Sequence, residues 1–170
     1  MRVVADAGVN KIRLTGGEPL VRADLPELVR QLTEVPGIQD IALTTNGMLL
    51  DQQAQELKRA GLQRLNISLD TLSEEVFQKI TRRQGLQKVL DGISAALEAG
   101  FDRLRLNAIA MKDLTETEIL PLVRFARDRR LELRFIEFMP LDAEKNWEVE
   151  QVLTGEEIRS RIAAEMGPLA

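Results

Sequence analysis

The 170-residue chain contains no cysteine and no histidine. These absences exclude disulfide bonds, metal sites ligated by either residue, and nucleophilic catalysis by a cysteine–histidine pair within this chain. No apolar run approaches the roughly 18 residues that a membrane-spanning helix needs, so we expect no membrane partner.

An excess of basic residues is also lacking, because 23 Lys and Arg stand against 27 Asp and Glu, a net charge of −4. Domains that bind nucleic acid usually have a basic excess, so we do not expect nucleic acid as a partner. The composition favours a soluble protein of the cytoplasm, with 44% hydrophobic residues to form one core.

Five short runs with alternating side chains predict strands, and helical periodicity separates them. The runs are Lys11–Thr15, Asp40–Thr45, Arg64–Leu69, Arg103–Ala110 and Glu132–Phe138. Strands that alternate with helices at regular spacing are typical of βαβ units. We therefore predict a single α/β domain with a parallel sheet.

Two helix starts have the spacing of a capping box, in which the side chains of the N-cap residue and of the third helical residue bond to the helix backbone. These are Asp24 with Glu27 and Thr115 with Glu118. A further start at Thr154 opens the last helix. We expect the first two pairs to cap their helices.

One face of the predicted strands is apolar, whereas the other is polar. The polar positions are Arg13, Thr15, Thr44, Asn66, Ser68, Arg105, Asn107, Glu132 and Arg134. A parallel sheet covered by helices on both faces, or a closed barrel filled with apolar side chains, does not have this pattern. We predict a partly open, curved sheet around a polar, anionic ligand, because arginine suits phosphate and carboxylate groups. The alternative is a self-contained network in which Glu132 and Glu137 pair with the arginines.

The first predicted strand runs into two glycines, an acid and a proline at Gly16–Pro19. Adjacent glycines let a backbone turn sharply and approach a ligand closely. In α/β folds, ligands bind at such strand ends. The alternative is an ordinary tight turn between a strand and a helix.

Four blocks of the chain resemble the radical S-adenosylmethionine superfamily and, within it, the GTP 3′,8-cyclase family of molybdenum cofactor biosynthesis. The blocks are Lys11–Leu20, Leu43–Gly47, Leu65–Asp70 and Arg134–Met139, and the first contains the GGEP signature. The resemblance implies that GTP is converted to (8S)-3′,8-cyclo-7,8-dihydroguanosine 5′-triphosphate, a lyase reaction that uses S-adenosylmethionine.

The resemblance also implies individual binding residues. For S-adenosylmethionine they are Gly16, Gly17, Glu18, Ser68 and Met139. For GTP they are Arg13, Thr44 and Arg105, the last where the family often has lysine, with Arg134 as a further candidate. The polar face adds Asn66 and Asn107 as candidates. We expect no catalytic residue and no metal ligand in this chain.

The family holds 4Fe–4S clusters with cysteines in an N-terminal loop and a C-terminal region, and this chain has none. The helical pattern over residues 2–8 also lacks the strand that normally precedes such a helix. We therefore expect residues 1–170 to be the central part of a partial, TIM-like (β/α) barrel truncated at both ends, without the cluster-binding segments.

Two alternatives stay open: another radical S-adenosylmethionine enzyme, such as one that modifies peptides, or a non-enzymatic α/β binding module. The resemblance allows a homodimer of the longer enzyme.

Overall fold

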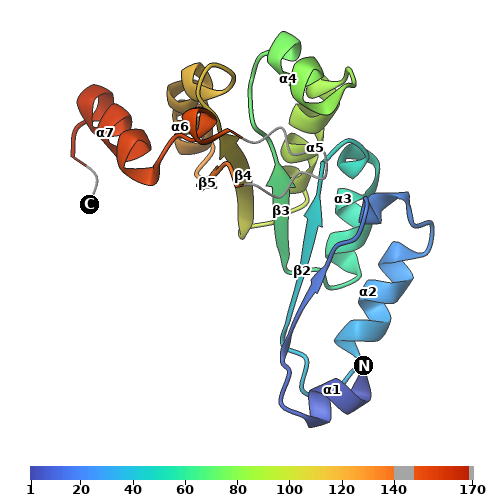
Figure 1. Cartoon of the computed structure of the whole chain (residues 1–170). Coiled ribbons are helices and arrows are strands. Elements are labelled where there is room, and N and C mark those ends of the chain that lie inside the picture. Colours follow the sequence, from blue (N-terminus) through green and yellow to red (C-terminus); the bar gives the residue numbers. More distant parts are fainter. Residues whose placement is uncertain (140–147, 169–170) are drawn as a thin grey trace. The chain divides into compact units, whose positions relative to one another are not determined.

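The computed structural model describes residues 1–139 and 148–168. Helices and strands alternate along the chain, as predicted (Figure 1). Their bounds are α1 (Arg2–Asp6), β1 (Lys11–Leu14), η1 (Pro19–Val21), α2 (Leu25–Thr33), β2 (Asp40–Thr45), α3 (Leu50–Arg59), β3 (Arg64–Ser68), α4 (Glu74–Thr81), α5 (Leu86–Glu98), β4 (Leu104–Ala110), η2 (Glu116–Glu118), α6 (Ile119–Asp128), β5 (Glu132–Glu137), η3 (Val149–Gln151) and α7 (Gly155–Met166).

The five strands form a parallel sheet in the order β1-β2-β3-β4-β5. This arrangement confirms the predicted α/β class, and each strand lies within one residue of its predicted bounds. The chain divides into two compact units. The first comprises Met1–Ser68 and Gly85–Arg105, and the second comprises Leu69–Gln84 and Leu106–Ala170. Each unit is described by itself.

In the first unit, helices α2, α3 and α5 lie along one side of strands β1, β2 and β3 (Figure 1). Helix α3 packs against both α2 and α5. The apolar core between helices and strands is fully enclosed, and its central side chains have no exposed surface: Leu43, Leu50, Leu57, Leu65, Ile67, Val89 and Ile93. Burial of these side chains is the main stabilising contribution to the unit.

The strand register shows that the opposite face is polar. Arg13 lies beside Ala42, and Ala42 beside Arg64, while Thr44 lies beside Asn66. Because side chains alternate along a strand, Leu43 and Leu65 point to the helices and these residues point away from them. The predicted division of the strands into an apolar and a polar face is therefore confirmed in the first unit.

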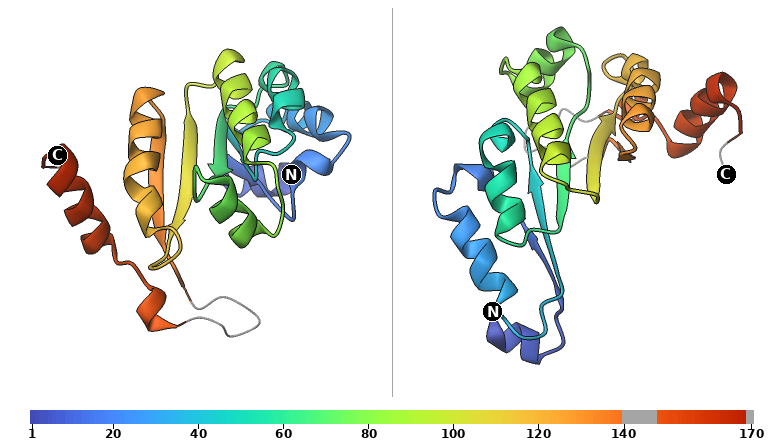
Figure 2. Two further views of the ribbon diagram at one scale, coloured as in Figure 1. Left: turned by 90° about the horizontal axis from the view of Figure 1, so that it is seen from above. Right: turned by 180° about the vertical axis from the view of Figure 1, so that it is seen from behind.

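The second unit has its own apolar cluster, formed by Ala110, Ile119, Leu153, Ile158 and Ile162. Helix α6 lies alongside β5, and α7 contacts both (Figure 2).

Within the described ranges, no helix has the length and apolarity needed to cross a membrane.

The two predicted capping boxes are wrong. The Asp24 carboxylate pairs with Arg22 instead of the helix backbone. The Thr115 hydroxyl donates to the carbonyl of Ile109 and accepts from the amide of Met111. In both cases a nearer competing partner occupies the side chain that the spacing assigns to the helix.

Candidate functional site

The glycine loop follows β1 directly and belongs to the first unit. Gly16 has φ = +150°, a conformation that residues with a Cβ rarely adopt. A Cβ on either Gly16 or Gly17 would meet no atom within 4 Å, and both residues are exposed. The loop thus presents bare backbone to open space, which a ligand can approach closely.

Glu18 connects this loop to the end of β2. Its carboxylate accepts hydrogen bonds from the Thr45 hydroxyl at 2.6 Å, the Asn46 amide at 2.8 Å and the Leu20 amide at 3.0 Å. The predicted assignment of Glu18 to the cofactor stays a prediction, but its side chain is already engaged by three protein donors.

A row of hydrogen bonds crosses three strands on the polar face. The Arg105 guanidinium donates to the side-chain oxygen of Asn66 at 3.2 Å, and the Asn66 amide group approaches the Thr44 hydroxyl at 3.4 Å. Asn66 is only 4% exposed, whereas Thr44 and Arg105 on either side of it are partly exposed. Three predicted site residues from β2, β3 and β4 are thus brought together.

Arg13 and Arg64 lie on either side of the small side chain of Ala42. Arg64 is held by a bidentate pair with Asp40, with N–O distances of 2.6 and 2.8 Å. Within residues 1–139 and 148–168, the side chain of Arg13 forms no hydrogen bond or ion pair. An open pocket of about 420 Å³ is lined by Lys11, Ile12, Arg13 and Arg64. Its surface is positively charged, as a site for an anionic ligand requires.

Ser68 ends β3 two residues after Asn66, on the same face, and it is exposed. The structure therefore places Arg13, Thr44, Asn66, Ser68 and Arg105 on one polar face of the first unit.

The remaining predicted site residues belong to the second unit. The backbone carbonyl of Asn107 accepts a hydrogen bond from the Leu69 amide at 2.9 Å. Arg134 is exposed and pairs with Glu132 at 2.8 Å. Met139 is 51% exposed. Among the described residues, Glu132 of the predicted self-contained network pairs with an arginine, whereas Glu137 accepts from the Gly155 amide at 2.6 Å.

Asp70 lies in the second unit, just after β3. Its carboxylate accepts a hydrogen bond from the Ile109 amide at 2.7 Å. Burial raises the pKa of this carboxyl group, and the Ile109 hydrogen bond only partly opposes that effect.

Sequence reasoning missed two features of the site, the Asp40–Arg64 pair and the contact of Glu18 with Thr45. The first could have been found, since Asp40 and Arg64 share the polar face by strand alternation. The second is a hydrogen bond between two side chains that are 27 positions apart in the chain, and no sequence signal reports it.

Among the described residues, no group of three or more acidic side chains could hold a metal ion. Iron–sulfur clusters are held by cysteine thiolates, and the chain has no cysteine. The residues of this chain therefore do not fit a 4Fe–4S cluster. The exposed glycine backbone and the Ser68 hydroxyl do fit a polar cofactor such as S-adenosylmethionine.

Comparisons with solved structures agree with this fold. Methylornithine synthase matches with a TM-score of 0.73 at 16% identity, over 99% of this chain and 52% of that one. Coproporphyrinogen III oxidase from Escherichia coli, described as a radical SAM enzyme, matches with a TM-score of 0.70 at 16% identity, over 96% of this chain and 46% of that one. The predicted TIM-like fold is confirmed.

The chain is also similar in sequence to longer proteins. A protein named GTP 3′,8-cyclase from Rhodopirellula baltica is 53% identical over 91% of this chain and 43% of its own length. Molybdenum cofactor biosynthesis protein 1 of Drosophila melanogaster is 46% identical over 90% of this chain and 27% of its own length. This chain thus spans less than half of either relative. The family model for the radical SAM superfamily matches residues 1–126. The chain belongs to the radical SAM superfamily.

Proposed function

We propose that this chain is the ligand-orienting central part of a GTP 3′,8-cyclase, as residues 1–170 of a longer barrel domain. The observation that supports this most strongly is the polar face of the first unit. There Arg13, Thr44 and Arg105 project from three different strands, and Asn66 hydrogen-bonds to two of them.

Within this proposal, the triphosphate of GTP binds to the charges of Arg13 and Arg105. Guanidinium groups donate paired hydrogen bonds that match phosphate geometry. The Arg13 guanidinium is available to bind phosphate, because it has no partner in the described part of the chain. The side-chain oxygen of Asn66 accepts a hydrogen bond from the Arg105 guanidinium at 3.2 Å, so this guanidinium is oriented before the ligand binds. Asn107 and Arg134 in the second unit remain candidates for further contacts with GTP.

S-adenosylmethionine binds, in the same proposal, to the backbone of Gly16, Gly17 and Glu18, to the Ser68 hydroxyl and to Met139. The open space around the two glycines supports this assignment. When bound, this cofactor supplies the radical chemistry that is common to the superfamily. The residues of this chain orient the cofactor and the substrate, and the iron–sulfur ligands lie outside these 170 residues.

Calorimetric titration of the chain with GTP tests the proposal. We expect Arg13→Ala and Arg105→Ala each to weaken binding about 10-fold or more, because each removes charge-assisted hydrogen bonds to phosphate. Arg59→Ala is the matched control, since Arg59 is exposed at the end of α3 and its loss should leave the affinity unchanged.

Equal affinity of all four proteins for GTP contradicts the assignment. Binding of S-adenosylmethionine without GTP favours a different radical SAM enzyme, such as a peptide-modifying one. Binding of GTP without S-adenosylmethionine favours a non-enzymatic binding module.

A further inference from the structure

The glycine loop after β1 has little packing of its own. A Cβ added to Gly16 or Gly17 would meet no atom within 4 Å, and the φ of Gly16 is accessible mainly to glycine. Glycine is the most flexible residue in an unfolded or mobile chain, so ordering such a loop needs an anchor beside it.

Glu18 is that anchor. It precedes η1, where its carboxylate caps the Leu20 amide at 3.0 Å. The same carboxylate accepts from the Asn46 amide at 2.8 Å, which joins the loop after β1 to the loop after β2. A carboxylate that accepts several hydrogen bonds, two of them from backbone amides, has a defined orientation.

Thr45 completes the connection from the side of β2. Its side chain is 2% exposed and lies on the helix-covered side, beside Ile67 in the neighbouring strand. Its hydroxyl donates to Glu18 at 2.6 Å and accepts from the Gly47 amide at 3.0 Å. The buried Thr45 hydroxyl therefore holds both the Glu18 carboxylate and the backbone turn at Gly47.

We propose that Glu18 and Thr45 form a positioning pair that holds the Gly16–Gly17 backbone in register with the end of β2. The pair acts through the loop and touches no ligand with its side chains. This inference rests on the proposed function, because it places the cofactor loop at a defined distance from the GTP-facing Thr44 on the adjacent strand.

The test uses the 170-residue chain with Thr45→Val, Thr45→Ser and Glu18→Gln. Amide hydrogen exchange reports the protection of Leu20 and Asn46, whose amides donate to Glu18, and calorimetry reports affinity for S-adenosylmethionine. We expect Thr45→Val and Glu18→Gln to speed exchange at both amides and to weaken cofactor binding about 10-fold. Thr45→Ser keeps the hydroxyl and should restore both properties to within about 2-fold of the wild type.

Val29→Ala serves as the control for a general loss of stability, because Val29 is a fully buried residue of α2 in the same unit. It should destabilise the unit while leaving loop exchange and cofactor affinity close to wild type. Unchanged exchange at Leu20 and Asn46 in Thr45→Val overturns the proposal, as does unchanged affinity together with faster exchange. If the wild-type chain binds no S-adenosylmethionine, the proposed function fails in this chain, and the exchange data alone decide whether the pair orders the loop.

Discussion

At the scale of single residues, Gly92 shows how closely the helices approach the site. A Cβ at this position in α5 would lie 2.6 Å from the carbonyl oxygen of Gly47 and 3.0 Å from the Cβ of Leu50. Only a residue without a side chain lets α5 support the loop that follows β2. That loop includes Asn46, which bonds to Glu18.

We expect Gly92→Ala to lower the free energy of unfolding by about 1–2 kcal/mol, because the clash with backbone outweighs the gain in helix propensity. Urea denaturation measures this change. Ser94→Ala on the exposed side of the same helix is the control and should change stability by less than about 0.5 kcal/mol. A Gly92→Ala variant as stable as Ser94→Ala would mean that the loop after β2 moves aside without cost.

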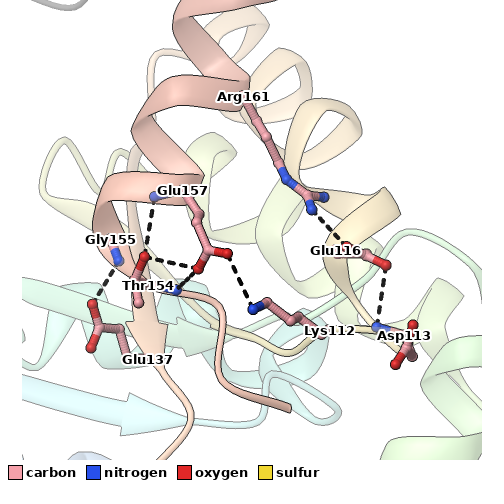
Figure 3. A network of polar contacts seen from close by, with 8 residues as sticks. All are labelled: Lys112, Asp113, Glu116, Glu137, Thr154, Gly155, Glu157 and Arg161. Carbon is pink, nitrogen blue, oxygen red and sulfur yellow. Dashed lines mark hydrogen bonds and ion pairs between the residues drawn. The ribbon is translucent and has the colours of Figure 1, made fainter. Parts of the chain in front are cut away.

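At the scale of elements, polar contacts connect α7 to other parts of the second unit, several of them from its first turn (Figure 3). The Glu157 carboxylate accepts from the amide and the hydroxyl of Thr154, each at 2.8 Å, and pairs with Lys112 at 3.1 Å. Glu137 accepts from the Gly155 amide, and Arg161 pairs with Glu116 at 2.7 Å (Figure 3). Thr154 and Glu157 form a complete capping box, unlike the pairs expected at Asp24 and Thr115.

The hydrogen bonds from Thr154 and the charge of Lys112 lower the pKa of Glu157 to about 2. A carboxyl whose pKa is lower in the folded state stabilises the fold above its unfolded pKa, and this contribution disappears as the pH falls toward the folded value. We therefore expect the start of α7 to loosen between about pH 4.5 and pH 2. Amide exchange at Glu157 and Ile158 measures the effect.

Glu157→Gln should show faster exchange at these amides already at neutral pH, and weaker dependence on acid. Glu156→Gln is the matched control, because Glu156 lies in the same first turn and is exposed. Identical acid profiles for the wild type and Glu157→Gln would contradict the assigned role of Glu157.

At the scale of the whole molecule, the residues that we propose to orient the ligands belong to a chain without a cysteine to hold iron. The family to which it belongs uses iron–sulfur clusters, and a cluster needs cysteine thiolates. The sequence of 170 residues has no cysteine, and it spans less than half of the Rhodopirellula baltica relative.

We expect this chain alone to form no 5′-deoxyadenosine from S-adenosylmethionine under reducing, anaerobic conditions, because it cannot ligate the cluster. Chromatography of the reaction mixture measures the product. The longer Rhodopirellula baltica protein named GTP 3′,8-cyclase, assayed in parallel, is the positive control. Product formation by the isolated chain would contradict this expectation.

The sequence by itself determined the positions of the strands, the polar face and the glycine loop. These features are local, since alternation of side chains and the conformational range of glycine depend on few neighbouring residues. The predicted strand bounds accordingly agree with the structure to within one residue.

Only the tertiary structure decided which partner each polar side chain takes. Glu18 looks like a ligand residue in its motif, yet its oxygens accept from Thr45 and Asn46. Asp24 has the spacing of a cap, yet it pairs with Arg22. Several donors compete for each acceptor, and the choice depends on distances between loops and strands that are far apart in the chain.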